Sequence, residues 1–166
     1  MNLGTYWDTS GNMIQNKNLT LNGYLSSSGI PYFTIFSNGT LSIANNTNVN
    51  FTAWDTVVDN QGLISCDGTN FTFPVAGVYS ITWTMNFAVN ATGNRGTWVL
   101  YVGNRYGNQT ASAFATNIVS LSSSCIIKVS AGDTILVRNY QNSGGALNCG
   151  TVTGGITARM SIIKSC

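Results

Sequence analysis

The chain has 166 residues, enough for one ordinary domain with a single core, and only 7% of them are charged, against roughly 25% in a typical soluble domain. It contains no His and no Glu, so a Ser–His–Asp or Cys–His arrangement cannot form within one chain, and we predict a protein that is not an enzyme and has no catalytic residue. The net charge of +2 comes from dispersed Lys and Arg residues, which argues against nucleic acid and anionic membrane surfaces as partners.

The chain has few side chains that could bind a metal or a cofactor. The cysteines lack the close C-x-x-C spacing of zinc sites, and the five Asp residues do not cluster as calcium ligands do, so we predict no metal and no cofactor. Cys66, Cys125, Cys149 and Cys166 allow three disulfide pairings, among which the sequence does not choose. Cys125 shares the apolar parity of its stretch and is predicted to be a core thiol, whereas Cys166, the last residue, is predicted to be accessible.

Residues 1–29 differ from the rest of the chain because they are rich in Gly, Asn and Ser and show little sustained alternation. We interpret them as a neck or stalk remnant, with a small hairpin over residues 19–25 around the turn pair Asn22-Gly23. Short β repeats of this kind occur in viral and phage fibre shafts, and a floppy terminus is the open alternative. The chain shows no secretory signal pattern and no run of roughly 20 apolar residues, so we expect no membrane insertion.

Residues 30–166 are predicted to form one head domain of short strands separated by turn signals, the pattern of an all-β sandwich. The clearest strand runs from Tyr79 to Val89, where every second residue is apolar and Ser, Thr or Asn fills the gaps. No segment carries a 3.6-residue apolar repeat, so almost no helix is expected. The other predicted strands cover 32–36, 40–44, 49–58, 97–102, 118–129, 134–140, the surroundings of Leu147, and 156–163.

Three stretches resemble the C1q-like globular head. Residues 50–62 (NFTAWDTVVDNQG) end in the Asn-x-Gly of that family, and residues 71–81 (FTFPVAGVYSI) resemble its F-x-x-P-x-x-G-x-Y-x-F core strand, with Ile81 in place of the usual Phe. Residues 130–137 (SAGDTILV) are similar to its G-D-x-V-x-V strand. The chain lacks the collagen-like Gly-x-y stalk of many such proteins. The resemblance extends over residues 30–163 and covers fold residues rather than ligand residues.

The resemblance implies a C1q/TNF-like jelly roll, a two-sheet antiparallel sandwich of about ten strands, assembled as a compact homotrimer. Strand parity then identifies apolar side chains that point away from the core on strands that face the trimer axis in the family. Scattered exposed apolar residues are the alternative interpretation. The candidates for the trimer interface are Tyr32, Phe36, Leu136, Tyr140 and Ile163.

The implied function is binding, with loops as the working surface. The candidates are the turn over residues 102–116, which holds Arg105, Tyr106, Asn108 and Gln109, and the Gly-rich loop over residues 141–155.

An Asn-rich, nearly uncharged composition without collagen favours a virion or fibre surface, where the head would attach to a host-surface protein or glycan. A capsid-stabilising protein that binds only other virion components, and a secreted C1q-like recognition protein, are the alternatives. The N-x-[ST] sequons are glycosylation sites only if the source has a secretory pathway.

Overall fold

The computed structural model describes residues 32–60, 64–113, 116–150 and 158–165, together with two short strands, β1 (Tyr6–Trp7) and β2 (Met13–Ile14). The chain divides into two compact units, Met1–Ile30 and Pro31–Cys166. In the first unit, β1 pairs antiparallel with β2. The hairpin predicted over residues 19–25 lies outside the described residues, and the role of residues 1–29 as a neck stays a prediction.

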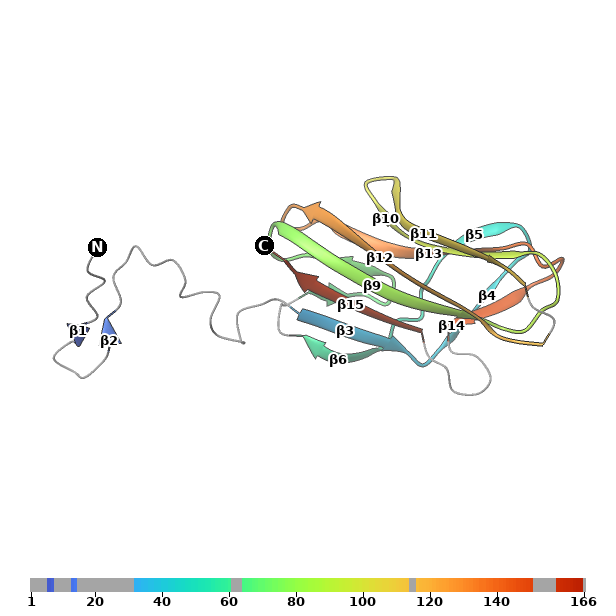
Figure 1. The fold of residues 1–166 in the computed structure, drawn as a ribbon, viewed down its shortest axis with the longest axis horizontal. Helices are drawn as coiled ribbons and strands as arrows, with labels where there is room; N and C mark the ends of the chain where they lie inside the picture. Colours follow the sequence, from blue (N-terminus) through green and yellow to red (C-terminus); the bar gives the residue numbers. More distant parts are fainter. Residues whose placement is uncertain are drawn as a thin grey trace. The chain divides into compact units, whose positions relative to one another are not determined.

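The larger unit contains two antiparallel sheets, and the seven-stranded one, which we call sheet I, is built around the long strand β9 (Figure 1). β12 pairs along one edge of β9, and β15 and β14 pair along its other edge. Farther out, β3 pairs with β15, β4 with β14, and β6 with β3. The strands of sheet I are β3 (Tyr32–Ser37), β4 (Thr40–Ile43), β6 (Thr56–Asn60), β9 (Gly77–Phe87), β12 (Val119–Val129), β14 (Leu147–Gly150) and β15 (Ala158–Lys164).

The six-stranded sheet, sheet II, is built around β13. β10 pairs along one edge of β13, while β5 and β8 pair along its other edge. β11 then pairs with β10, and β7 with β8. The strands of sheet II are β5 (Thr47–Asn50), β7 (Ser65–Cys66), β8 (Asn70–Thr72), β10 (Asn94–Tyr101), β11 (Asn104–Ser112) and β13 (Thr134–Gln141).

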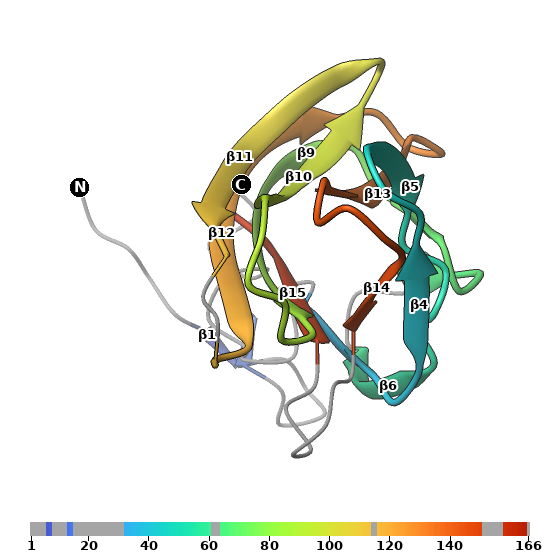
Figure 2. The ribbon, with the colours of Figure 1, turned by 90° about the vertical axis from the view of Figure 1, so that its right-hand side faces the viewer.

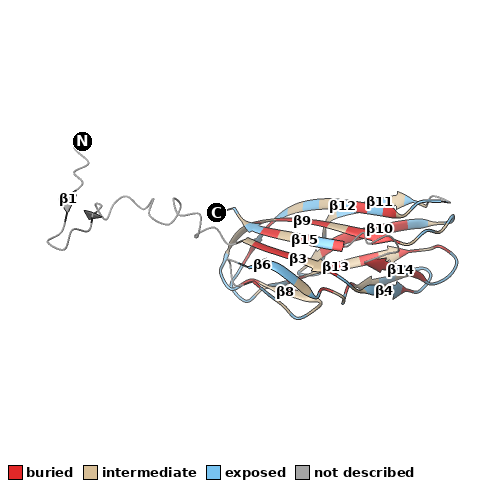
Figure 3. Ribbon diagram, turned by 90° about the horizontal axis from the view of Figure 1, so that it is seen from below, coloured by how far each residue is buried: buried red, intermediate tan, exposed pale blue. Residues whose placement is uncertain are grey.

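The core lies between the two sheets and follows the period-two alternation of the strands (Figure 3). Along β9, Tyr79, Trp83 and Phe87 point inward and are at most 2% exposed. Aromatic rings connect the layers: Phe33 of β3 and Phe71 of β8 meet edge to face with centroids 5.8 Å apart. Seen end-on, β11 of sheet II runs beside β12 of sheet I and covers one side of the sandwich (Figure 2). Each large buried side chain contributes about 2 kcal/mol to folding, so the alternation itself specifies the two layers.

The all-β, two-sheet fold class is confirmed, and no helix occurs among the described residues. One predicted strand is wrong. Residues 49–58 form two strands in different sheets, β5 and β6, because residues 51–55 cross from sheet II to sheet I. Phe51 and Trp54 are buried in this crossing, with ring centroids 4.8 Å apart. Their three-residue spacing fits an irregular crossing better than the period of two of a strand.

The prediction of a loop over residues 102–116 is also wrong for most of its length. Val102 and Gly103 alone make the turn, and β11 follows as a strand that pairs with β10. β11 has one paired neighbour in its sheet, and its side chains are mostly polar and exposed, so its composition is that of a loop. No helix within the described ranges is long and apolar enough to cross a membrane.

Candidate functional site

The outer face of sheet I carries mostly hydroxyl side chains. Because Tyr79, Trp83 and Met160 point into the core, their strand neighbours point away from it. Strand register places these outward residues in straight rows across the sheet. We call this surface the Ser/Thr face, and it consists of Tyr32, Thr34, Phe36, Ser80, Thr82, Thr84, Ser122, Ser124, Ile126, Arg159, Ser161 and Ile163.

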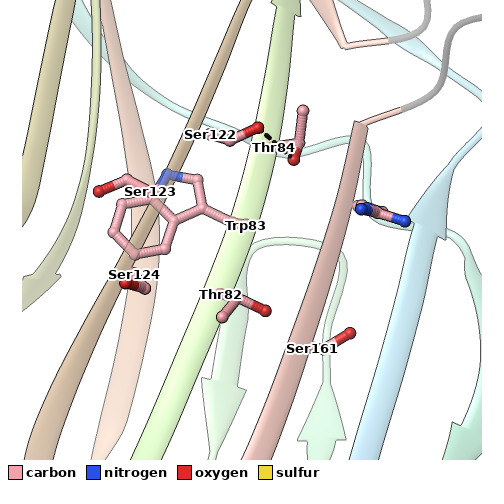
Figure 4. A pocket seen from close by; sticks show the side chains of 8 residues that line it. Thr82, Trp83, Thr84, Ser122, Ser123, Ser124 and Ser161 are labelled. Carbon is pink, nitrogen blue, oxygen red and sulfur yellow. Dashed lines mark hydrogen bonds between the residues drawn. The ribbon is translucent and has the colours of Figure 1, made fainter.

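The centre of the Ser/Thr face is hollow because its side chains are short. An open cavity of about 490 Å³ lies over β12, β9 and β15, and Figure 4 shows the hydroxyls of Thr84, Ser122 and Ser161 on three neighbouring strands around it. The Arg159 guanidinium also lines this cavity. The hollow is open to solvent, so its shape fits a broad partner surface better than a deeply held small molecule.

Many hydroxyls of the Ser/Thr face already bond to one another. Thr34 Oγ1 lies 2.6 Å from Tyr32 Oη and 3.1 Å from Ser161 Oγ, and Thr84 Oγ1 lies 2.9 Å from Ser122 Oγ. A partner that covered them would leave few unpaired donors, which are what make polar surface costly to bury. The face can therefore lose its water at low cost in free energy.

Exposed apolar side chains concentrate on sheet I. Ile126 is 68% exposed and Ile163 40%, and both flank Ser80 in one row of the Ser/Thr face. Val57 and Val58, on the edge strand β6 of the same sheet, are each more than half exposed. Several exposed apolar side chains on one sheet are consistent with an interaction surface.

The outer face of sheet II has a different chemistry. Val99 and Val137 point into the core, so Trp98 and Arg138, which lie opposite one another on β10 and β13, point outward. Long charged and aromatic side chains replace the short hydroxyls of sheet I. We call this surface the Arg face, and it consists of Asn48, Asn50, Gly96, Trp98, Leu100, Arg105, Thr110, Leu136, Arg138 and Tyr140.

Hydrogen bonds and ring contacts hold the Arg face in shape. Arg138 donates its Nε to Asn50 Oδ1 at 2.8 Å, and Tyr140 donates its hydroxyl to Asn46 Oδ1 at 2.8 Å. The Arg105 guanidinium carbon lies 4.2 Å from the centroid of the Trp98 ring, a cation–π contact. Arg105 thereby lies over the Trp98 ring, and Arg138 is the register partner of Trp98 on the adjacent strand.

The structure separates the five residues predicted for the trimer interface. Tyr32, Phe36 and Ile163 belong to the Ser/Thr face, whereas Leu136 and Tyr140 belong to the Arg face on the other sheet. The five therefore do not form one surface, because the parity of a strand tells which residues share a face but not which sheet the strand joins. Sequence reasoning also missed Ile126, although an exposed Ile among the serines of β12 was a visible signal.

The predicted ligand residues of the 102–116 segment also separate. Arg105 lies on the Arg face, while Tyr106 stacks on Tyr101, with ring centroids 6.2 Å apart, and is half-buried. Asn108 and Gln109 are exposed on β11. Their role in ligand binding stays a prediction.

The Gly-rich segment over residues 141–155 is held from within where it is described. The buried Gln141 accepts from the Ser143 amide and donates its Nε2 to the carbonyls of Gly145 and Ile43, each at 2.8 Å or less. The chain then continues into β14, and residues 151–157 lie outside the described residues. The described part of this segment that precedes β14 is therefore a turn held by side-chain hydrogen bonds.

The thiols and carboxylates of the described residues form no metal site: no group of three or more His, Cys, Asp or Glu side chains occurs among them. Cys66, Cys125 and Cys149 are free thiols, and Cys125, predicted to be a core residue, is half-buried against the core. Burial raises the pKa of Cys66 and of Cys125 to about 11 and that of Cys149 to about 12. These thiols are poor nucleophiles and poor metal ligands at neutral pH.

No protein-family model matches the chain, and no curated protein matches its sequence. Solved structures do match its fold. Eiger TNF from S. frugiperda is 12% identical with a TM-score of 0.61, over 82% of this chain and 93% of that one. The PRD1 vertex protein P5 is 19% identical with a TM-score of 0.58 (81% and 96%), and murine APRIL at pH 5.0 is 17% identical with a TM-score of 0.58 (81% and 98%). The chain therefore has the TNF/C1q-like jelly-roll fold that its motifs predicted.

Proposed function

We propose that this chain is a non-enzymatic, homotrimeric binding head on the surface of a virion or fibre, where it attaches to a host receptor or glycan. The observation that carries the proposal is the Ser/Thr face, a broad, hydroxyl-bonded and partly apolar surface with an open hollow at its centre. The fold shared with a TNF and with a vertex protein supports a displayed, self-associating head. The lack of His and Glu, the usual general acids and bases, supports binding rather than catalysis.

The size of the Ser/Thr face suits self-association. The five strands from β12 to β6 span about 20 Å and β9 is about 35 Å long, which gives about 700 Å² of face, close to the roughly 800 Å² that a stable interface takes from each partner. Its apolar row supplies the hydrophobic contact, and its hydroxyls supply hydrogen bonds without the cost of burying many charges. A closed ring of three copies would cover this face on every copy.

Light scattering on the purified chain tests the assembly. We expect a mass of three times 17.7 kDa at micromolar concentration. Thr82→Arg places a long charged side chain at the exposed centre of the Ser/Thr face and should yield a folded monomer, whereas Thr134→Arg, at an exposed position of sheet II, should leave the mass unchanged. A monomeric wild type would overturn the homotrimer. A trimeric Thr82→Arg variant would show that another surface makes it.

Attachment is tested separately, with the labelled wild-type protein on a panel of animal and bacterial cells. Saturable binding to one cell type supports a host-attachment head. The competing function is a capsid-stabilising protein, which the likeness to a vertex protein favours. Retention on purified particles with no binding to any cell would support that function. A secreted recognition protein is the third candidate, and a secretory signal in the precursor would support it.

A further inference from the structure

The Arg face contains a buried donor without an acceptor. Trp98 is only 2% exposed, and its Nε1 has no hydrogen-bond partner among the described residues. It is buried although it points away from the core, because Arg105 lies over its ring. A buried N–H that bonds to nothing costs about 1–3 kcal/mol, so such a donor calls for an acceptor that binds there.

Within the described part of the chain, Arg105 and Arg138 also lack an anionic partner. Arg138 uses its Nε on Asn50, and its terminal nitrogens meet no acceptor among the described residues. Arg105 contacts the Trp98 ring and forms no ion pair with any carboxylate whose side chain the structure describes. The long stem of Arg105 leaves its guanidinium free to turn toward an incoming anion. A carboxylate could accept from both arginines and from the indole at once.

Two described carboxylates of sheet II and its turns are engaged elsewhere. Asp67 accepts from the amides of Thr69 and Asn70 and from the Asn70 side chain, and these bonds lower its pKa. Asp133 accepts from the Tyr101 hydroxyl at 2.6 Å and from the Ser130 amide at 2.7 Å. Neither is hydrogen-bonded to Arg105 or Arg138. The positive charge of the face is thus left for a ligand.

A second hollow lies at the β10–β11 end of the Arg face. Its volume is about 320 Å³, and Asn94, Arg95, Thr110, Ala111, Ser112 and Tyr140 line it. Gly96 lies opposite both Thr110 and Tyr140, and a Cβ there would lie 3.4 Å from the Thr110 methyl and 3.5 Å from the Trp98 ring. Amides, hydroxyls, one aromatic ring and the buried Arg95 around a single hollow suit a compact ring with several hydroxyl groups. An extended acidic peptide would instead need pockets at regular intervals along its length.

We infer that the Arg face binds a saccharide that carries a carboxylate. Arg105, Arg138 and the Trp98 Nε1 take the carboxylate, and the ring of the sugar lies against Tyr140 in the adjoining cavity. This inference rests on the proposed attachment function and names the class of its ligand. It also moves the ligand from the loops to the face of a sheet.

The probes are the methyl glycosides of N-acetylneuraminic acid and of glucuronic acid, titrated by NMR into the full-length chain. The neutral controls are the methyl ester of the first and methyl glucoside in place of the second. We expect at least one acidic glycoside to bind with a dissociation constant of about 1 mM, and its neutral control at least about tenfold more weakly. No binding of either acid at about 10 mM, or equal binding of the neutral sugar, would overturn the inference.

Two variants locate the site. Arg138→Gln should weaken binding about tenfold or more, whereas Lys128→Gln, which removes an exposed charge on sheet I, should not. Trp98→Phe removes the unpaired donor and keeps an aromatic ring, so binding should fall several-fold while thermal stability is kept or raised. Unchanged binding by both Arg138→Gln and Trp98→Phe would sink the inference.

The remaining outcomes separate the inference from the proposed function. If the trimer attaches to cells but binds neither acidic glycoside, the proposed function is supported and the proposed ligand class is wrong. If a short Asp-rich peptide binds as tightly as the acidic glycoside, the proposed ligand class is also wrong, because the Arg face would then recognise negative charge and not the sugar.

Discussion

The two outer faces of this sandwich arise from the same alternation of side chains, yet they suit opposite tasks. The Ser/Thr face presents short hydroxyls that bond to one another, such as Thr84 to Ser122, beside an apolar row. The Arg face presents two arginines around a buried tryptophan. A neutral face can be covered permanently at low cost in free energy, whereas a face with unpaired charges is costly to bury and serves better to recognise an anion. Self-association and ligand binding therefore need not compete for one surface.

The interior behind the two faces can be compared through one thiol from each sheet. Cys149 of sheet I is fully buried and Cys66 of sheet II half-buried. The pKa of Cys149 is raised from 9.0 to about 12, so its thiolate fraction at pH 8 should be about 1,000-fold lower in the folded protein than in the unfolded chain. The pKa of Cys66 is raised to about 11, so its thiolate fraction should be about 100-fold lower. Because the thiolate is the reactive form, the alkylation rates should fall by the same factors. Mass spectrometry after timed alkylation measures both rates. As pH rises, Cys66 should become reactive first. Equal rates would mean that sheet I opens locally at β14.

The contact between the sheets should be sensitive at Gly107. Its φ is +57°, and a Cβ there would lie 2.5 Å from Trp83 Cη2 and 2.6 Å from the Ser124 carbonyl oxygen. Gly107→Ala should therefore lower the free energy of unfolding by about 2–4 kcal/mol, from backbone strain and overpacking together.

The matched control is Gly103→Ala, where φ is +74° but nothing lies within 4 Å of the added atom. It should cost only the backbone strain, about 1 kcal/mol. Urea denaturation measures both variants. Equal losses would show that β11 does not press against sheet I at this point.

The hairpin tip of sheet II, next to the Arg face, should be stabilised by Val102→Asn. Val102 has a φ of +48° and is 76% exposed, and with Gly103 it forms a two-residue turn in which both residues have positive φ. Asn tolerates this conformation and a β-branched residue does not, so the variant should gain about 1 kcal/mol. The urea midpoint measures the gain. A loss of stability would mean that Val102 makes a contact that stabilises the protein by more than the backbone strain destabilises it.

Salt should distinguish the two faces by a smaller effect. Raising NaCl from about 0.05 to 0.5 M shortens the screening length from roughly 14 Å to roughly 4 Å, so acidic glycoside binding at the Arg face should weaken several-fold. The mass of the assembly should not change, because the Ser/Thr face has few charges. Light scattering and NMR titration at the two salt concentrations provide the comparison. Dissociation of the assembly at high salt would contradict the assignment of the neutral face to self-association.

Much of the fold was predictable because its signals are local. The alternation from Tyr79 to Val89 predicted a buried strand, and the structure buries its apolar residues from Tyr79 to Phe87. The last residue of the prediction was wrong, because β9 ends at Phe87 and Val89 is 48% exposed. The loop prediction for residues 102–116 failed because β11 is an edge strand of mostly polar, exposed residues, and its few half-buried positions make no apolar alternation. The prediction of one strand over residues 49–58 failed because a segment that crosses between sheets can be as apolar as a strand without the two-residue alternation of a strand.

By itself the sequence determined which side chains share a face, because alternation within one strand fixes parity, and it determined the chemistry open to the protein, because His and Glu are absent. Only the tertiary structure decided which sheet each strand joins. It placed Tyr140 on the same sheet face as Trp98 rather than beside Tyr32, since strand pairing depends on partners distant in the chain. The two faces exist because of that pairing, and no single strand contains the information that specifies it.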